Sequence, residues 1–384
     1  MDGTFLSYSK AQSRAHELRT GGKLPVRQAL LHARQRTLAL ADAYALALAP
    51  TNLQVRYAPE LNPPLWEWGH LAWFQEYWIS RNRQRPLGVK CNPEHQRFPS
   101  LLPQADDCYD SGRVEHRSRW SLPLPALAET RRYLDSTLEQ TLVLLDQLPA
   151  DATQDELYFF RLVALHEAMH AEAATYMAAS LGVPLPPAEP AEPALAAPRP
   201  ALGRIAVPAQ NFKAGSPIEG FAFDNELLDH HEALPAFEID SVPVSWARFM
   251  PFVRAGGCAP RAGWEEAAAH DPHAAAVHVS AIEAEAWCRW AGRRLPTEAQ
   301  WECAAVQAAG FVWGEVWEWT SSSFEPYPGF TPHPYRDYSQ PWFGSRRVLR
   351  GACGATSPWL AHPRYRNFFE PGRSDIFAGF RSCA

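Results

Sequence analysis

Hydrophobic positions in the first half of the chain recur at the spacing of helices that bury one face. Between residues 125 and 148, leucines follow one another at separations of seven, four and three positions: Leu127, Leu134, Leu138, Leu142, Leu145 and Leu148. Similar patterns predict helices over residues 26–48, 64–82 and 153–181, the last of which stops at Gly182. Four long amphipathic helices indicate a helix bundle, and bundle cores commonly hold metal sites.

The pattern changes after a segment rich in proline and alanine. Residues 185–201 have a composition that tends to stay extended, which predicts an interdomain linker. Beyond this segment, short apolar stretches alternate with Gly, Pro and Asn turns. Helices are expected there only near residues 245–255 and 280–291 and from Thr297, a plausible N-cap residue.

These patterns together predict an α+β multidomain protein. We expect a helix bundle over residues 1–184 and an irregular α+β domain with long loops over residues 202–384. Loops of that kind commonly carry binding groups. Within the first half, the connection over residues 83–121 is long and polar, so we expect it to carry turns of its own or to reach across to the second half. The length of 384 residues agrees with two or three domains.

Composition and charge narrow the class of protein. The formal net charge of -6 argues against nucleic acid or an anionic membrane as the main partner, because both require a basic surface. No apolar run approaches the roughly 20 residues that span a bilayer. The seven cysteines include no CxxC pair, so a structural zinc site is not expected. The N-terminus lacks a basic, apolar signal region, and we therefore expect a reduced, cytoplasmic compartment.

Three histidines are the strongest candidates for chemistry. His166 and His170 stand four residues apart, which places both imidazoles on one face of the predicted helix. His70 lies within the aromatic segment 66–78, where a solvated role is improbable. If the three converge, they could hold one face of a metal ion and leave the opposite face open. The alternative is that they are core histidines with ordinary hydrogen bonds, although burying unpaired imidazoles is costly.

The surroundings of these histidines suggest further roles. Glu172 follows His170 by two residues and could orient an imidazole from behind, or could simply be a solvated helix charge. Gly69 has no side chain and would permit the close approach of another helix or of a ligand. Three neutral imidazoles suit zinc, iron or copper, so the residues alone leave the metal open.

Four segments of the second half resemble the formylglycine-generating-enzyme fold, a C-type-lectin-like α+β fold: residues 291–302, 317–320, 349–351 and 379–381. In the first half, His70 and the HxxxHxE pattern that starts at His166 resemble the metal-binding four-helix bundles of the DinB-like type. The pairing of the two resembles the ergothioneine-pathway sulfoxide synthases. These are non-haem iron enzymes that join a chalcogen to the imidazole of hercynine (Nα-trimethylhistidine).

The resemblance implies a cofactor, substrates and site residues. Fe(2+) would be held by His70, His166 and His170, with dioxygen as co-substrate and hercynine as a small-molecule substrate. Asn367 matches a residue near the hercynine imidazole, and the residues expected to line the substrate site with it are Phe368, Phe369 and Met169. A phenol could deliver a proton or hydrogen atom, and the candidates are Tyr327, Tyr335 and Tyr338. Formylglycine chemistry is disfavoured because Cys353 has no evident partner cysteine.

Two departures from the family pattern bear on the chalcogen donor. Met169 stands where ergothioneine synthases usually have Gln, which removes a hydrogen-bond partner for the imidazole. Phe368 and Phe369 replace the frequent Trp-Asp pair, which removes a carboxylate near the substrate. Together with the segment 62–70, these departures resemble the selenoneine synthase branch of the family, which couples hercynine to a selenosugar. A trimethylammonium group can still contact aromatic faces.

Other functions remain open from the residues. The first alternative is carbon–sulfur bond formation with cysteine or glutamylcysteine. A second is a metal-dependent thiol S-transferase, which would work without oxygen and prefer zinc. A third is a non-enzymatic binding module with structural histidines, which would be stable without metal.

Overall fold

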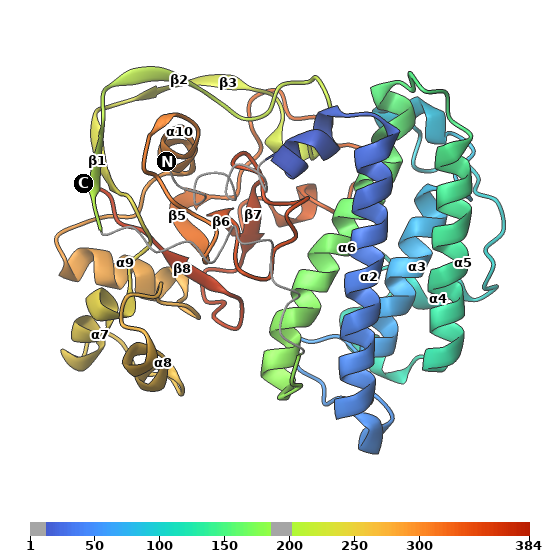
Figure 1. The fold of residues 1–384 in the computed structure, drawn as a ribbon, viewed down its shortest axis with the longest axis horizontal. Helices are drawn as coiled ribbons and strands as arrows, with labels where there is room; N and C mark the ends of the chain where they lie inside the picture. The colour runs from blue at the N-terminus through green and yellow to red at the C-terminus, as the bar shows by residue number, and fades with distance from the viewer. Residues whose placement is uncertain (1–12, 186–201) are drawn as a thin grey trace, which may run out of the picture.

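The computed structural model describes residues 13–185 and 202–384, which form two bodies packed side by side (Figure 1). A bundle of long helices makes up one body, and short strands, short helices and loops make up the other. The expected linker over residues 185–201 lies almost entirely outside the described residues. In the described part of the chain, no helix has the length and apolar character needed to cross a bilayer.

The predicted four-helix bundle is confirmed. Its long helices are α2 (Lys23–Ala47), α3 (Pro64–Trp78), α5 (Leu127–Asp146) and α6 (Gln154–Leu181). Helix α6 begins with a reciprocal capping box between Thr153 and Glu156 and ends at Gly182, whose φ of 66° suits a residue without a side chain. The helix predicted over residues 64–82 is shorter than expected, because α3 ends at Trp78.

The connection between α3 and α5 carries turns of its own and also reaches the other body. It contains η2 (Arg85–Lys90), α4 (Ala105–Tyr109) and η3 (His116–Ser121), and an earlier turn, η1 (Ala49–Thr51), follows α2. Gly112 in this connection lies so near the C-terminal body that an added Cβ would come 2.6 Å from a carboxylate oxygen of Asp337. Both expectations for residues 83–121 are therefore met.

The C-terminal body is built from small sheets and short helices, as the α+β prediction required. Its strands are β1 (Arg204–Val207), β2 (Gln210–Ala214), β3 (His230–Leu234), β4 (Phe237–Asp240), β5 (Trp317–Ser323), β6 (Arg347–Gly351), β7 (Asn367–Phe369) and β8 (Ala378–Phe380). Strand β1 pairs with β4 and β2 with β3, while the larger sheet has the order β7-β6-β5-β8, with β5 and β8 parallel. Its helical elements are η5 (Asp224–Glu226), α7 (Trp246–Arg254), α8 (Trp264–His270), α9 (Ala281–Trp290), α10 (Glu298–Gln307) and η6 (Gln340–Trp342). Helix α8 was not predicted, because seven residues are too few to show a helical period.

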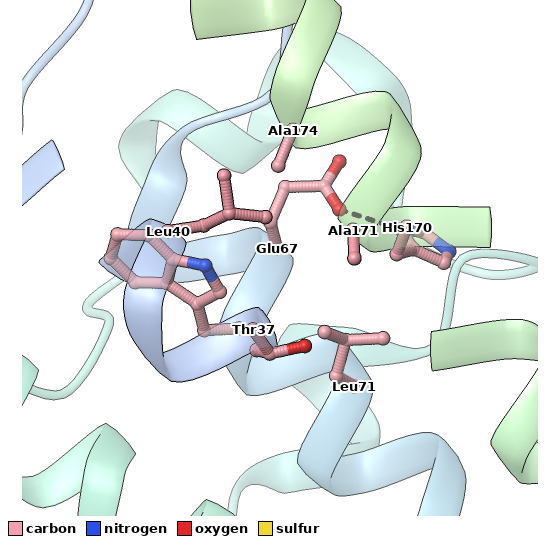
Figure 2. A pocket seen from close by; sticks show the side chains of 8 residues that line it. Thr37, Leu40, Glu67, Leu71, His170, Ala171 and Ala174 are labelled. Atoms are coloured by element: carbon pink, nitrogen blue, oxygen red, sulfur yellow. Dashed lines mark hydrogen bonds and ion pairs between the residues drawn. The ribbon is translucent and has the colours of Figure 1, made fainter. Parts of the chain in front are cut away.

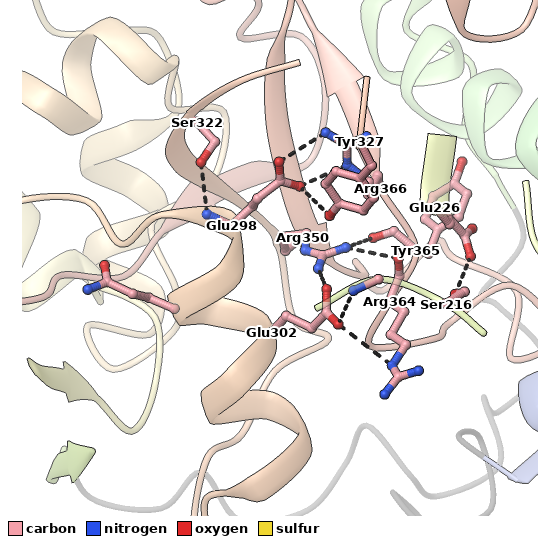
Figure 3. A network of polar contacts seen from close by, with 12 residues as sticks. Ser216, Glu226, Glu298, Glu302, Ser322, Tyr327, Arg350, Arg364, Tyr365 and Arg366 are labelled. Carbon is pink, nitrogen blue, oxygen red and sulfur yellow. Dashed lines mark hydrogen bonds and ion pairs between the residues drawn. The ribbon is translucent and has the colours of Figure 1, made fainter. Parts of the chain in front are cut away.

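The motif segments of this body meet in a buried charge network (Figure 3). The guanidinium of Arg366 donates to both carboxylate oxygens of Glu298, at 2.8 and 2.9 Å. Arg350 on β6 is paired with Glu302 on α10, and both side chains are fully buried. These ion pairs connect the helix to the strands. The segments that carry the family resemblance in this half are thus largely structural.

The two bodies are joined at α6. The carboxylate of Glu172 accepts hydrogen bonds from Trp317 Nε1 at 2.6 Å and from Thr356 Oγ1 at 2.5 Å, both in the C-terminal body. A second link is formed by Arg19, whose Nη2 donates to Glu226 Oε1 at 3.0 Å. The helix that carries two of the candidate metal ligands is therefore also the helix that docks against the other body.

Candidate metal centre

The three histidines singled out in the sequence converge in the bundle core. His70 comes from α3, while His166 and His170 come from successive turns of α6. One ring nitrogen of each lies within 4.8 Å of those of the other two. His70 and His166 are each only 2% exposed, whereas the side chain of His170 is 23% exposed and marks the open side of the cluster.

Hydrogen bonds from behind orient two of the imidazoles. His70 Nδ1 lies 2.8 Å from the carbonyl oxygen of Tyr109, and His170 Nδ1 lies 2.6 Å from Glu67 Oε2. A carbonyl oxygen only accepts, so Nδ1 of His70 must carry the proton and its Nε2 presents a lone pair. That Nε2 is 3.3 Å from Nε2 of His166. A cation shared by these nitrogens would satisfy lone pairs that otherwise face one another.

Burial keeps two of the imidazoles, those of His70 and His166, neutral, as metal ligands must be. Burial lowers the pKa of His70 to about 3, and burial and the two neighbouring imidazoles hold the pKa of His166 well below its usual value. Glu67 is buried, which by itself raises the pKa of its carboxyl, but the neighbouring His170 brings that pKa down to about 2. Three imidazole nitrogens backed by one carboxylate fit a divalent transition-metal ion.

Aromatic rings fix the planes of the imidazoles. Phe74 stacks on His166 with ring centroids 3.5 Å apart and planes 5° apart, and Trp66 stacks on His70 at 4.8 Å and 9°. These contacts cover one face of each imidazole and limit rotation of the rings. They also explain why the segment 66–78 is so rich in aromatic residues.

A small cavity lies behind Glu67 (Figure 2). It is lined by Thr37, Leu40, Glu67, Trp68, Leu71, His170, Ala171 and Ala174. Most of this lining is apolar, so the Glu67 carboxylate is directed to the imidazole of His170 rather than to solvent. Because the cavity lies on the Glu67 side of His170, it belongs to the support of the centre and is not the place for a substrate.

The structure separates the three candidate tyrosines. The ring of Tyr335 lies 4.9 Å from Phe74 and 6.0 Å from His166, beside the centre. Tyr338 is its neighbour, with ring centroids 5.9 Å apart. Tyr327 is placed elsewhere: its hydroxyl donates to Glu298 at 3.1 Å and its ring lies under Arg366. Its proton is already used in the charge network, which is a structural role.

The candidate substrate residues are likewise divided. Met169 touches Tyr338, whose hydroxyl lies 3.6 Å from Met169 Sδ, and Phe368 packs 5.8 Å from the ring of Tyr338. Asn367 and Phe369 flank Phe368 on β7 and point to the opposite face of the strand, because side chains alternate along a strand. Of these four, the structure therefore brings Met169 and Phe368 to the tyrosines beside the centre.

One interpretation of a neighbouring residue was wrong. Glu172 does not support an imidazole, because a separation of two residues on a helix turns it away from His170 and towards Trp317. The carboxylate that supports His170 is that of Glu67. Glu67 stands three positions before His70, and this spacing, which places two residues on one helix face, could have indicated it from the sequence. Gly69 permits the close approach of another helix, as expected: an added Cβ would meet the ring of Tyr109, the last residue of α4, at 2.1 Å.

A further residue at the site was missed from the sequence. The hydroxyl of Tyr365 lies 3.1 Å from Met169 Sδ and 3.0 Å from the hydroxyl of Tyr338. Tyr365 precedes β7 in an irregular stretch, where no periodic pattern indicates which way a side chain points. Cys353 is a buried free thiol whose Sγ lies 3.4 Å from the Thr356 hydroxyl, close to the Glu172 contact.

Comparisons with known proteins agree with both halves of this arrangement. The DinB superfamily matches residues 29–179, and the sulfatase-modifying factor enzyme 1-like domain matches residues 191–315 and 308–384. A formylglycine-generating enzyme of Streptomyces coelicolor is 29% identical, over 52% of this chain and 94% of its own length.

Two relatives match along nearly the whole length. The hercynine oxygenase of Mycolicibacterium thermoresistibile is 32% identical over 92% of this chain and 93% of its own length. That of Mycolicibacterium smegmatis is 31% identical over 91% of this chain and 96% of its own length. With its histidine centre in a DinB-like bundle docked on a sulfatase-modifying-factor-like domain, the chain belongs to the hercynine oxygenase family.

Proposed function

We propose that the protein is an oxygen-dependent non-haem iron enzyme that forms a carbon–selenium bond between a selenosugar and C2 of the hercynine imidazole. The observation that carries the proposal is the convergence of His70, His166 and His170 beside the ring of Tyr335, in a chain related to hercynine oxygenases over both halves.

The overall reaction balances without a further reductant. Hercynine loses the hydrogen on C2 and the selenol donor loses its hydrogen, while the carbon–selenium bond forms. One atom of dioxygen ends on selenium as a selenoxide and the other leaves as water. When bound, ferrous iron supplies the site for dioxygen and passes the electrons to it.

The residues of the chain have separable tasks. Glu67 and the Tyr109 carbonyl hold the imidazoles in one orientation, and Phe74 excludes water from the buried side. Holding the reacting atoms side by side supplies proximity. Burial, followed by the nearby carboxylates of Asp337 and Asp110, raises the pKa of Tyr335, so its phenol stays protonated and can donate a proton or hydrogen atom.

The preference for selenium rests on the groups around the tyrosines. Met169 and Phe368 offer a thioether and an aromatic face and carry no charge to pair with an amino-acid zwitterion. A selenosugar needs no such charged partners, and the trimethylammonium group of hercynine can lie against aromatic faces. Carbon–sulfur bond formation with cysteine or glutamylcysteine is the second candidate, supported by the relatedness to hercynine oxygenases.

A competition assay decides between the donors. The iron-loaded protein receives hercynine and oxygen with equal amounts of selenosugar, cysteine and glutamylcysteine, and the products are identified by mass. We expect the selenium adduct to dominate, and a dominant sulfur adduct would favour the second candidate. An arm without oxygen should give no product, whereas turnover there would favour a thiol S-transferase.

Substitution of a ligand tests the centre itself. We expect His166→Ala to abolish hercynine-dependent oxygen consumption, because the cluster loses a buried nitrogen donor. His231→Ala, at an exposed position of β3, is the matched control and should turn over normally. Normal turnover of His166→Ala would refute the proposal.

A further inference from the structure

Three side chains from both bodies of the protein meet at Met169, the residue before His170, and the proposed reaction gives no role to the hydrogen bonds between them. Met169 comes from α6, Tyr338 from the loop between β5 and β6, and Tyr365 from the segment before β7. The Tyr365 hydroxyl is 3.1 Å from Met169 Sδ and 3.0 Å from the Tyr338 hydroxyl, while Tyr338 is 3.6 Å from the same sulfur.

The number of protons restricts how this cluster is bonded. Each phenol carries one proton and the thioether carries none, so two protons must serve three contacts. The two shorter contacts are used together only if Tyr338 donates to Tyr365 and Tyr365 donates to Met169. In the opposite arrangement, Tyr338 would have to use the 3.6 Å contact to sulfur. The distances therefore favour a chain that runs from Tyr338 through Tyr365 to Met169.

This direction leaves the oxygen of Tyr338 with a free lone pair. Tyr365 is 3% exposed, whereas Tyr338 is half-buried and next to Tyr335, so the free lone pair belongs to the more accessible of the two phenols. Because the proton of the Tyr338 hydroxyl is used in the bond to Tyr365, its oxygen can only accept from a ligand, and an N–H group suits it.

The rings of the cluster are held firmly. Phe223 packs against both tyrosines, at 4.6 Å from Tyr338 and 5.7 Å from Tyr365. Trp317, which donates to Glu172 on α6, lies 5.8 Å from Tyr365. The hydroxyl positions are therefore fixed relative to the helix that carries His166 and His170.

We propose that Tyr365 is a positioning residue that holds the Tyr338 hydroxyl as a hydrogen-bond acceptor for the N–H of the hercynine imidazole. The inference rests on the proposed function. It assigns to Tyr365 an effect on substrate binding that passes through Tyr338, with Met169 as the anchor at the end of the chain.

The test measures equilibrium binding of hercynine to the iron-loaded protein without oxygen, by calorimetry, together with KM and kcat for turnover. For Tyr365→Phe we expect the dissociation constant and KM to rise about 5–10-fold, the value of roughly one hydrogen bond, with kcat little changed. Tyr338→Phe should behave alike, and the double variant should be no worse than Tyr338→Phe alone, because Tyr365 acts only through the Tyr338 hydroxyl. Met169→Leu should weaken binding less, since Tyr365 then only loses its anchor.

Tyr44→Phe is the matched control, because Tyr44 is a buried tyrosine whose hydroxyl donates to the Ala174 carbonyl at 2.7 Å. It should lower thermal stability and leave hercynine binding unchanged. Wild-type affinity in Tyr365→Phe, or additive losses in the double variant, would overturn the inference and leave the proposed function standing. Failure of the wild-type protein itself to bind hercynine would overturn the proposed function and this inference with it.

Discussion

The two bodies of the molecule use their buried charges for different purposes. In the bundle, two buried carboxylates lie next to the candidate metal centre: Glu67 holds His170, and Glu167, the neighbour of His166, pairs at 2.8 Å with Arg34. In the C-terminal body, the buried pairs instead hold the backbone together. Arg350 pairs with Glu302 between β6 and α10.

This difference follows from the architecture of each body. Long helices bury a continuous apolar face, so the bundle gains its stability from packing. Its buried polar groups are therefore available to form a site. Short strands and long loops bury less continuous surface, and ion pairs with fixed geometry hold such segments in one arrangement. The tyrosines beside the centre can be presented by a loop because that loop is anchored in a rigid network.

The largest effect is expected from breaking the charge network. Glu302→Gln leaves the fully buried guanidinium of Arg350 without its counter-charge, and such a loss costs about 3–5 kcal/mol of the free energy of unfolding. Chemical denaturation followed by tryptophan fluorescence measures it. A cost below 1 kcal/mol would mean that the C-terminal body does not depend on the pair.

The tyrosines sharpen the contrast between site and scaffold. We expect Tyr335→Phe to lower kcat roughly 10²–10⁴-fold, the range for loss of a proton donor, with a normal affinity for hercynine. Tyr327→Phe removes a hydroxyl bonded to Glu298 and should cost about 1 kcal/mol of stability with near-normal turnover. Steady-state assays and denaturation curves on both variants test the division, and equal turnover of the two would contradict it.

The support of the centre is tested by metal affinity. Glu67→Gln keeps the shape of the side chain but removes the charge that orients His170, and we expect metal binding to weaken about 10–100-fold. Titration of the metal-free protein with Co(II), followed by its visible spectrum, reports the affinity without any turnover. Glu139→Gln, an exposed substitution on α5, serves as the control. An unchanged affinity in Glu67→Gln would remove the carboxylate from the centre.

The smallest effect is expected for an ion pair on the surface of the bundle. Arg27 and Asp146 lie 2.9 Å apart with side chains 39% and 63% exposed. Asp146→Asn should cost less than about 1 kcal/mol, because water screens such a pair. Denaturation under the conditions used for Glu302→Gln compares the two directly. A cost as large as that of the buried pair would show that the contrast between the bodies is not one of burial.

The parts of the site that follow a helical period could be predicted from the sequence. His166 and His170 share a helix face at a spacing of four, and the aromatic context of His70 indicated a buried position. The same spacing rule, applied to the carboxylates, favours Glu67 over Glu172. Residues three positions apart on a helix share a face, whereas residues two positions apart do not.

The tyrosines could not be ranked in this way. Tyr327, Tyr335 and Tyr338 all belong to the loop between β5 and β6, where the chain has no repeating geometry to orient its side chains. Their positions depend on contacts made across the molecule, such as those of Tyr327 with Glu298 and of Tyr335 with Phe74. Tyr365 escaped notice for the same reason.

Glu172 stands two residues beyond His170 on α6, with both of its oxygens bonded into the C-terminal body. Coupling between docking of the C-terminal body and metal binding by the bundle would be reciprocal: whatever strengthens one would strengthen the other by the same factor. We therefore expect a bundle that is separated from the C-terminal body by cleavage at the linker to bind its metal ion with lower affinity. Adding the C-terminal body back in trans should restore that affinity.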